Sequence, residues 1–299
     1  MRIAVTGAAG FIGAQVVRRL REAGDEVLAV VRKGKHPSRL RELPGLRVHE
    51  LTLEDTKGLR LWLEGERPDA VVHLAWYARP QDYLVSPENL ASLAATARLA
   101  EAVFASGCRK LVGVGTCLEY AAADRPFVES DPADPVSPYA SAKHAAFLVA
   151  RALAARAGAE LAWARVFHLF GPGEDPSRLV PTVAASLARG EPIDVTAGEQ
   201  VRDHLHVADV AAGIAALVRP GASGVFNVCS GTARPLRELI LAIGQLRGRA
   251  DLLRFGARSY APGEVMFLAG QADRLRGLGW APRFPTLEAG LADALREDS

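Results

Sequence analysis

The stretch "RIAVTGAAGFIGAQVVRRLREAGDEVLAVV", residues 2–31, decides the fold. A short apolar strand is predicted over 2–6, a glycine-rich turn follows it, and apolar residues at helical spacing predict a helix over 11–23. A second apolar strand is predicted over 26–31. Two strands joined by one helix in so short a stretch make a β-α-β unit, which requires parallel strands and a right-handed crossover.

The alternation of strands and helices continues beyond this unit. Strands are predicted over 46–51, 69–76, 109–116 and 161–167, and helices over 56–65, 87–106 and 138–157. These strands have no polar face, which indicates a sheet covered by helices on both sides. We therefore expect an α/β protein with a Rossmann-type, doubly wound parallel sheet and a smaller C-terminal α/β lobe. The boundary is placed near 165, giving domains over 1–165 and 166–299, with some later segments returning to the first sheet.

Charge and composition exclude several classes of protein. The 299 residues carry 36 Lys and Arg against 34 Asp and Glu, with no run of five like charges, which argues against nucleic acid as a partner. No apolar stretch approaches the ~20 residues of a membrane-spanning helix, and no signal-peptide pattern is present. We expect a cytoplasmic protein without membrane association. Cys108, Cys117 and Cys229 are scattered, and His204 and His206 lack a third ligand, so no metal is expected.

The glycines of the first turn suit the close approach of a ligand. Gly7, Gly10 and Gly13 follow a GxxGxxG pattern between the first strand and the first helix. Backbone amides and the positive end of the helix face outward there, and a Cβ at the turn would hold a pyrophosphate away. A plain tight turn is the alternative, but the flanking strand and helix favour nucleotide binding. We predict a dinucleotide-binding domain over 1–165, with Phe11 and Ile12 also in contact.

The end of the second strand indicates which dinucleotide is bound. A carboxylate there grips the ribose hydroxyls of NAD and repels the 2′-phosphate of NADP. This strand ends in "VVRKGKH" (30–36), where Arg32, Lys33 and Lys35 can pair with a phosphate and no acid competes. A solvated basic loop is the alternative. We predict NADP as cofactor, with NAD as the alternative. Three further contacts are assigned to the cofactor: Leu53, Ala75 and Val166.

The helix over 138–157 carries two chemically useful groups one turn apart. Tyr139 and Lys143 share a face because positions i and i+4 of a helix do. A nearby cation favours the phenolate form of tyrosine, so we expect Lys143 to lower the pKa of Tyr139. Thr116, at the end of the strand over 109–116, is placed to hold a substrate oxygen. Tyr-x-x-x-Lys alone is usually a surface pair, but beside a dinucleotide turn it favours hydride transfer between a carbinol and a ketone.

Taken together, the motifs resemble those of the extended short-chain dehydrogenases/reductases, the group of nucleotide-sugar epimerases, dehydratases and reductases. They are "VTGAAGFIG" (5–13), "VVHLAW" (71–76), "GTCLEY" (115–120), "YASAK" (139–143), "RVFHLFGPG" (165–173), "GEQVRDHLHVADV" (198–210) and "LGWAP" (278–282). The resemblance implies that Thr116, Tyr139 and Lys143 are catalytic, and that Lys143 also holds the nicotinamide ribose. It implies a nucleotide-sugar-binding role for 166–299 and a homodimer joined through the helices over 87–106 and 138–157.

The residues after Thr116 distinguish the branches of this family. Its 4,6-dehydratases carry Asp-Glu there, whereas Cys117 and Leu118 follow in this chain, so dehydration is disfavoured. Arg32 favours a net reductase over a 4-epimerase, because a reductase draws electrons from NADPH while an epimerase recycles bound NAD. The stretch 256–284 is similar to CDP-abequose synthase-like reductases. We expect NADP-dependent reduction of the C4 ketone of a nucleotide-linked 4-keto-6-deoxyhexose, with Tyr139 as proton donor.

Two alternatives to this expectation stay open. One is an NAD-dependent nucleotide-sugar 4-epimerase, and the other, from a different class, is a sensor or scaffold that binds a dinucleotide without turnover.

The resemblance carries over to the substrate side only in part. Arg202 matches the family arginine that contacts the nucleotide diphosphate, a role that suits a guanidinium. His168 replaces an asparagine of the family pattern, and Ala261 replaces an arginine, for which Arg258 can substitute. Thr116 and Cys117 are further predicted substrate contacts. Asn89 matches an asparagine that the family uses near the active site, or it simply caps a turn.

Overall fold

The computed structural model describes residues 1–34, 37–41 and 43–296, and within them one large sheet has seven strands that are all parallel. The strand order is β11-β6-β5-β4-β1-β2-β3, so the chain winds outward from β1 in both directions. The strands are β1 (Arg2–Thr6), β2 (Glu26–Val31), β3 (Arg47–Glu50), β4 (Ala70–His73), β5 (Lys110–Thr116), β6 (Glu160–Val166) and β11 (Gly224–Val228). The predicted doubly wound α/β fold is confirmed.

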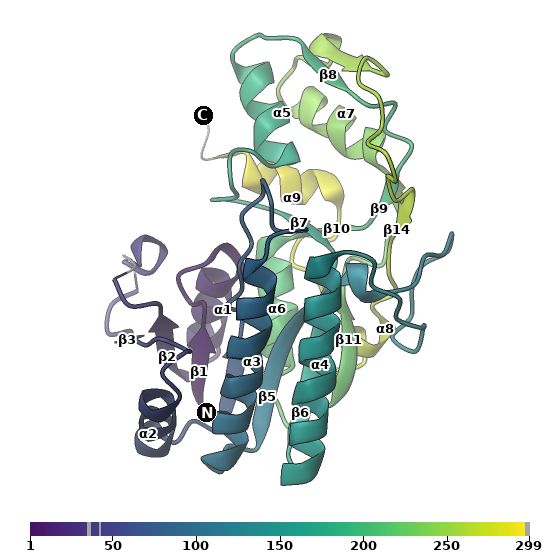
Figure 1. Ribbon diagram of the computed structural model, residues 1–299. Coiled ribbons are helices and arrows are strands. Elements are labelled where there is room, and N and C mark those ends of the chain that lie inside the picture. The colour runs from purple at the N-terminus through teal and green to yellow at the C-terminus, as the bar shows by residue number, and fades with distance from the viewer. Residues whose placement is uncertain (35–36, 42, 297–299) are drawn as a thin grey trace.

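Helices cover both faces of this sheet (Figure 1). One face is covered by α1 (Phe11–Glu22) and α6 (Val207–Ala216). The other is covered by α2 (Thr56–Glu66), α3 (Glu88–Ala105) and α4 (Pro138–Ala157). Two covered faces explain why the strands lack a polar side. Among the described residues, no helix combines the length and apolar character that crossing a bilayer requires.

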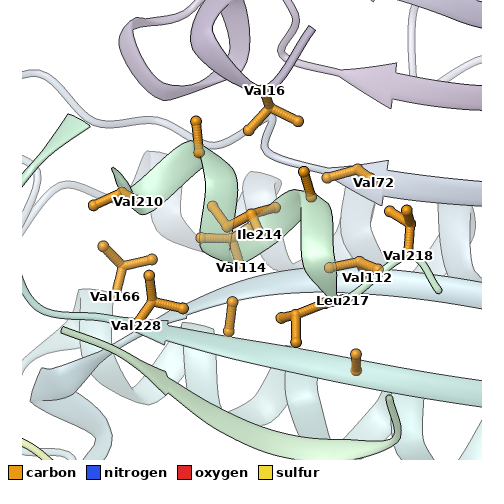
Figure 2. Close-up of a cluster of buried hydrophobic side chains, with 14 of the residues drawn as sticks. Val16, Val72, Val112, Val114, Val166, Val210, Ile214, Leu217, Val218 and Val228 are labelled. Atoms are coloured by element: carbon orange, nitrogen blue, oxygen red, sulfur yellow. The ribbon is translucent and has the colours of Figure 1, made fainter. Parts of the chain in front are cut away.

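The core beneath α6 is made of aliphatic side chains. Figure 2 shows Ile214 of α6 among residues from the strands β4, β5, β6 and β11 and from α1. The labelled members are Val16, Val72, Val112, Val114, Val166, Val210, Ile214, Leu217, Val218 and Val228. Burying one side chain of this kind contributes about 1.5–3 kcal/mol. Because α6 and β11 come from the second half of the chain, that half completes the core of the first sheet.

A smaller lobe lies beyond the carboxyl ends of the strands (Figure 1). It contains α5 (Leu179–Ala188), α7 (Leu236–Leu246), α9 (Leu287–Ala294) and the parallel pair β8 (Ile193–Val195) and β13 (Leu253–Phe255), around an apolar cluster of its own. The division of the chain near 165 stays a prediction, since β11 returns to the first sheet.

Short strands connect the two lobes. β7 (His168–Phe170) pairs with β10 (His204–His206), and β9 (Val201–Arg202) lies between β12 (Arg234–Pro235) and β14 (Phe267–Leu268). The remaining short elements are α8 (Asp273–Arg276), η1 (Ser38–Leu40), η2 (Cys117–Glu119) and η3 (Ala250–Leu252). These connections place β7, β9 and β10 next to the carboxyl end of the large sheet, where ligands of doubly wound folds bind.

The fourth strand is shorter than the sequence predicts. β4 ends at His73 and does not reach Trp76. Its neighbour β1 ends at Thr6, opposite His73, and the chain then turns at Gly7 with a φ of +68°. A Cβ on Gly7 would lie 2.7 Å from the backbone nitrogen of Ala75. The ladder therefore stops where β1 turns, and the residues after His73 pass close over the glycine turn.

Both ends of α4 are fixed by local sequence signals. The Ser137 side chain accepts a hydrogen bond from the backbone N–H of Ala140 at 3.2 Å, and Pro138 occupies the first helical position. Gly158 ends the helix in the left-handed conformation, with a φ of 57°. The start of α4 is thus defined to the residue, which puts Tyr139 in its first turn and Lys143 one turn later.

Replacing Ile214 with Ala tests the core between α6 and the sheet. The fully buried side chain leaves a cavity, so the free energy of unfolding is expected to fall by about 2–5 kcal/mol in urea denaturation. Leu61→Ala on α2 is the control, because Leu61 is 59% exposed. An equal loss in both variants would contradict this description of the core.

Candidate active site

The turn after β1 forms a cradle that only glycines permit. A Cβ on Gly7 would collide with the backbone of Leu74 and Ala75, and one on Gly13 would collide with the Gly7 carbonyl. Gly10 is the N-cap of α1 and provides no side-chain cap, so the first N–H groups of the helix, on Phe11 and Ile12, have no partner within the helix. Such a cradle fits the pyrophosphate of a dinucleotide.

The residues predicted to select the cofactor lie at the exposed end of β2. Arg32 and Lys33 follow Val31 directly, and within the described ranges neither side chain has a hydrogen-bond or ion-pair partner. Lys35 lies outside the described residues. The two side chains are free to meet a phosphate. Of the other predicted cofactor contacts, Leu53 is half-buried beyond β3, Ala75 lies over the glycine turn, and Val166 ends β6.

The three predicted catalytic residues converge at the carboxyl end of β5. Tyr139 and Lys143 lie on α4, and Thr116 is the last residue of β5. The Thr116 side chain acts to lower the pKa of Tyr139, although burial has the larger and opposite effect, so the two hydroxyls lie near each other. The Lys143 ammonium donates to the backbone oxygen of Val114 at 2.7 Å. Two elements distant in sequence thus present a phenol, a hydroxyl and an amine at one place.

The expected effect of Lys143 on Tyr139 is wrong. Burial raises the pKa of Tyr139, and the neighbouring Tyr83, Cys117 and Glu119 raise it further. Burial also acts on Lys143, whose side chain is 5% exposed, and lowers its pKa to about 7. With a pKa of about 7, the Lys143 amine is partly neutral at physiological pH and offers a neighbouring phenolate less positive charge than an ordinary lysine would. Tyr139 is therefore a neutral phenol at physiological pH, which is the form that donates a proton.

A buried carboxylate behind Thr116 was not anticipated from the sequence. The Glu119 side chain is 0% exposed and receives hydrogen bonds from the Thr116 backbone N–H at 2.9 Å, Trp163 Nε1 at 3.1 Å and Arg165 Nε at 3.1 Å. Nδ1 of His144 lies 3.4 Å from its second oxygen. Burial acts to raise the pKa of Glu119, but the His144 hydrogen bond and the Arg165 charge outweigh it, so the pKa is lowered.

Glu119 fixes the chain at the point where β5 ends. Together with the Thr116 side chain, which accepts from the backbone N–H of Leu118 at 3.3 Å, it forms a capping box. The sequence signal was present, since "TCLE" matches the Ser/Thr-x-x-Glu pattern of that motif. Because its oxygens are engaged by four donors, Glu119 is not available as a general acid or base. The orientation of Thr116 depends on it instead.

The positions after Thr116 offer no acid–base pair. Burial raises the pKa of the Cys117 thiol to about 12, and Leu118 has no titratable group. Water elimination needs an additional acid and base, and Glu119 is turned into the protein; the exclusion of this reaction stays a prediction.

The predicted substrate residues fall into two groups. Arg202 of β9 and Cys117 are close enough to alter each other's pKa, and Arg202 also lowers the pKa of His168 on β7, although burial is the larger cause there. The rings of His168 and His204 are 5.4 Å apart. These residues gather between the lobes. Arg258 does not join them in the described residues: its side chain is exposed, and its backbone N–H donates to Val195 in the upper lobe.

No group of three His, Cys, Asp or Glu side chains that could hold a metal ion occurs in the described part of the chain.

His73 is engaged in the core, between the hydroxyls of Thr6 at 2.7 Å and Thr96 at 2.9 Å. Burial lowers its pKa to about 3, so it is a neutral, structural histidine.

Most of this chain matches a known protein family. The family model described as "NAD dependent epimerase/dehydratase family" matches residues 3–229. The chain belongs to this family. Its members are extended short-chain dehydrogenase/reductase enzymes, as the motifs indicated.

Individual relatives cover nearly the whole chain. A UDP-glucose 4-epimerase of Streptomyces lividans is 29% identical over 93% of this chain and 90% of its own length. A dTDP-glucose 4,6-dehydratase of Mycolicibacterium smegmatis is 30% identical over 99% of this chain and 92% of its own. Among solved structures, MoeE5 in complex with UDP-glucose and NAD is 32% identical, covers 100% of both chains and has a TM-score of 0.84. Relatives of this chain therefore include proteins of two branches and one that binds NAD.

The network around Glu119 is tested by Glu119→Gln. An amide has only one oxygen to accept from four donors and no charge to balance Arg165, so the free energy of unfolding is expected to fall by about 3–5 kcal/mol. Chemical denaturation measures the loss. The control is Glu64→Gln on α2, where an exposed pair with Arg60 is broken and little change is expected. A small loss in Glu119→Gln would contradict the network.

The buried ammonium of Lys143 is tested by the pH dependence of stability. Its pKa is about 7 in the folded protein and near 10.5 when unfolded, so between these values the unfolded chain keeps a proton that the folded protein has lost. Stability from this group therefore rises with pH across the window, by on the order of 1 kcal/mol per pH unit.

Three other titratable groups lie close to the Lys143 ammonium: Glu119, His73 and Tyr139. The free energy of unfolding of the wild type, relative to Lys143→Met, should increase between pH 7 and pH 10 in urea titrations. A constant difference would mean that Lys143 does not titrate there.

Proposed function

We propose that the protein reduces the C4 ketone of a nucleotide-linked 4-keto-6-deoxyhexose with NADPH. The observation that carries the proposal is the exposed pair Arg32 and Lys33 at the end of β2, where a carboxylate would repel the 2′-phosphate. NADPH is the pool from which a net reductase takes electrons. The similarity of 256–284 to CDP-abequose synthase-like reductases supports the same direction.

The residues of this chain would divide the work as follows. When bound, the reduced nicotinamide supplies the hydride for C4. The glycine cradle, with Phe11 and Ile12, holds the pyrophosphate, while Arg32 and Lys33 take the 2′-phosphate. Lys143 holds the nicotinamide ribose through its N–H donors.

Tyr139 would donate the proton. Thr116 orients the ketone oxygen against the phenol, and Tyr139 gives its proton to that oxygen as negative charge develops on it. A phenol whose pKa is raised by burial is protonated when the reaction begins. The reaction direction that starts from a protonated phenol is reduction.

The nucleotide diphosphate would lie between the lobes. Arg202 offers it a guanidinium that now donates to Glu264 at 2.8 Å. His168 and Cys117 border the same region, whereas the exposed Arg258 lies apart from it in the upper lobe.

A nucleotide-sugar 4-epimerase with NAD is the second candidate. The 4-epimerase of Streptomyces lividans favours it, because it is similar to this chain over nearly its full length. An epimerase would retain its NAD through purification and would need no added reductant.

We also propose a homodimer in the cytoplasm. The face formed by α3, α4 and the turn before α3 exposes apolar side chains, among them Val85 and Leu90, both 70% exposed, together with Leu148 and Val149. A second copy of the chain would cover them in a four-helix arrangement.

Replacing Tyr139 with Phe tests the proposed function. With dTDP- or CDP-4-keto-6-deoxyglucose as substrate, NADPH oxidation is expected to slow by about 10²–10⁴-fold, because the proton donor is lost. Tyr77→Phe is the control, since that hydroxyl is on a loop and donates to Asp82. Undiminished turnover in Tyr139→Phe would refute the proposal. Interconversion of a UDP-hexose by protein carrying bound NAD, without NADPH, would establish the epimerase instead.

A further inference from the structure

The environment of the Lys143 ammonium contains no ion pair. Its Nζ lies 2.7 Å from the Val114 oxygen, and in the described part of the chain no carboxylate lies within ion-pair distance. Glu119 acts on it only through space. A buried ammonium without a counter-ion carries a large desolvation cost. Some other group must compensate for part of that cost.

The indole of Trp76 supplies this compensation. The Lys143 Nζ lies over the Trp76 ring, 3.9 Å from its centroid. Tryptophan has the most favourable ring face for a cation, and the contact is stronger at a desolvated site than at an exposed one. An aromatic face attracts the cation without adding a negative charge beside an anionic dinucleotide. It also leaves ammonium donors available, since Val114 takes only one of three.

The orientation of Trp76 is itself fixed. Its Nε1 donates to the Asn89 side-chain oxygen at 2.9 Å, and the Asn89 amide donates to the backbone oxygens of Tyr83 at 2.7 Å and Ser86 at 2.9 Å. Asn89 is 1% exposed and uses both its oxygen and its amide nitrogen in this way. Asn89 therefore holds both the turn before α3 and the indole of Trp76.

Trp76 also borders the catalytic phenol. Its ring meets that of Tyr139 edge-on, with centroids 6.4 Å apart, while Tyr83 meets Tyr139 from another side at 5.0 Å. The indole therefore contacts both members of the Tyr139–Lys143 pair and sets the space between them. Its place after β4, next to the glycine cradle, is where the chain crosses from the dinucleotide site to the catalytic residues.

We propose that Trp76 is a positioning residue, which holds the Lys143 ammonium by a cation–π contact so that its free donors face the ribose of the dinucleotide. Asn89 sets the plane of the indole. The inference rests on dinucleotide binding by this site and not on which sugar is reduced. Trp76 acts through Lys143, so its contribution should disappear when Lys143 is removed.

A double-mutant cycle on dinucleotide affinity tests this dependence. Trp76→Leu is expected to weaken NADP or NAD binding, measured by calorimetry without any sugar, by about tenfold, which is roughly 1.4 kcal/mol. In a Lys143→Met background the same change should weaken binding less than twofold. Trp76→Phe keeps a ring face and should fall between the wild type and Trp76→Leu.

The matched control is Trp62→Leu. Trp62 is also partly buried, and its Nε1 donates to His49 at 3.0 Å, but it lies on α2 away from Lys143. Its replacement should leave dinucleotide affinity unchanged in both backgrounds. Additive effects of Trp76→Leu and Lys143→Met, or wild-type affinity in either, would overturn the inference. Because no sugar is present, that result would leave the proposed reduction standing.

A second measurement separates a cation–π contact from plain packing. The coupling between Trp76→Leu and Lys143→Met in the free energy of unfolding should be present at pH 6 and largely lost at pH 9, where Lys143 is mostly neutral. Of its neighbours, His73 is neutral, Glu119 ionised and Tyr139 protonated at both pH values. Equal coupling at the two pH values would mean that Trp76 only packs, and would overturn the inference. Trp76→Met, which also lacks a ring face, replaces Trp76→Leu in the cycle if the latter does not fold.

Discussion

The candidate site depends on a buried amine, the side chain of Lys143, which is 5% exposed. Three different groups make this possible for Lys143: the Val114 carbonyl, the face of Trp76 and the more distant charge of Glu119. Each comes from a different element, and all three lie close to the carboxyl end of the sheet. Burial of this amine in the folded protein lowers its pKa to about 7. The same burial keeps the neighbouring phenol protonated.

Fold and site are connected through the ends of the strands. β1 ends in the glycine cradle, β4 stops beside it, and β5 ends at Thr116, where Glu119 closes the turn. The parallel arrangement brings these ends to one edge, and the upper lobe covers that edge (Figure 1). α6 and β11 return from the second half of the chain to support it. The two halves of the sequence therefore build a single site, and both contribute to the core of the large sheet, whereas the upper lobe has an apolar cluster of its own.

Local patterns in the sequence predicted the fold and the elements that carry the candidate catalytic residues, and they did not predict the electrostatics. The β-α-β unit follows from apolar periodicity and the glycine spacing, and the start of α4 from Ser137 and Pro138. The direction of the Tyr139 pKa depends on its burial and on the electrostatic effect of Tyr83 and Cys117, which no local pattern reports. The role of Glu119 in the turn could have been predicted, because Thr116-x-x-Glu119 matches a capping box. Its contacts with Trp163 and Arg165 could not, because these residues come from a different strand. The early end of β4 depends likewise on its neighbour β1.

The protonation state of Tyr139 tests the account most directly. The protein has five tyrosines, so ¹³C NMR of protein labelled at the tyrosine Cζ, with Tyr139→Phe to assign the signal, can follow this phenol alone. The account predicts that its chemical shift stays that of a neutral phenol from pH 6 to pH 10. A transition to phenolate near neutral pH would contradict it, and would show that the Lys143 charge outweighs burial after all.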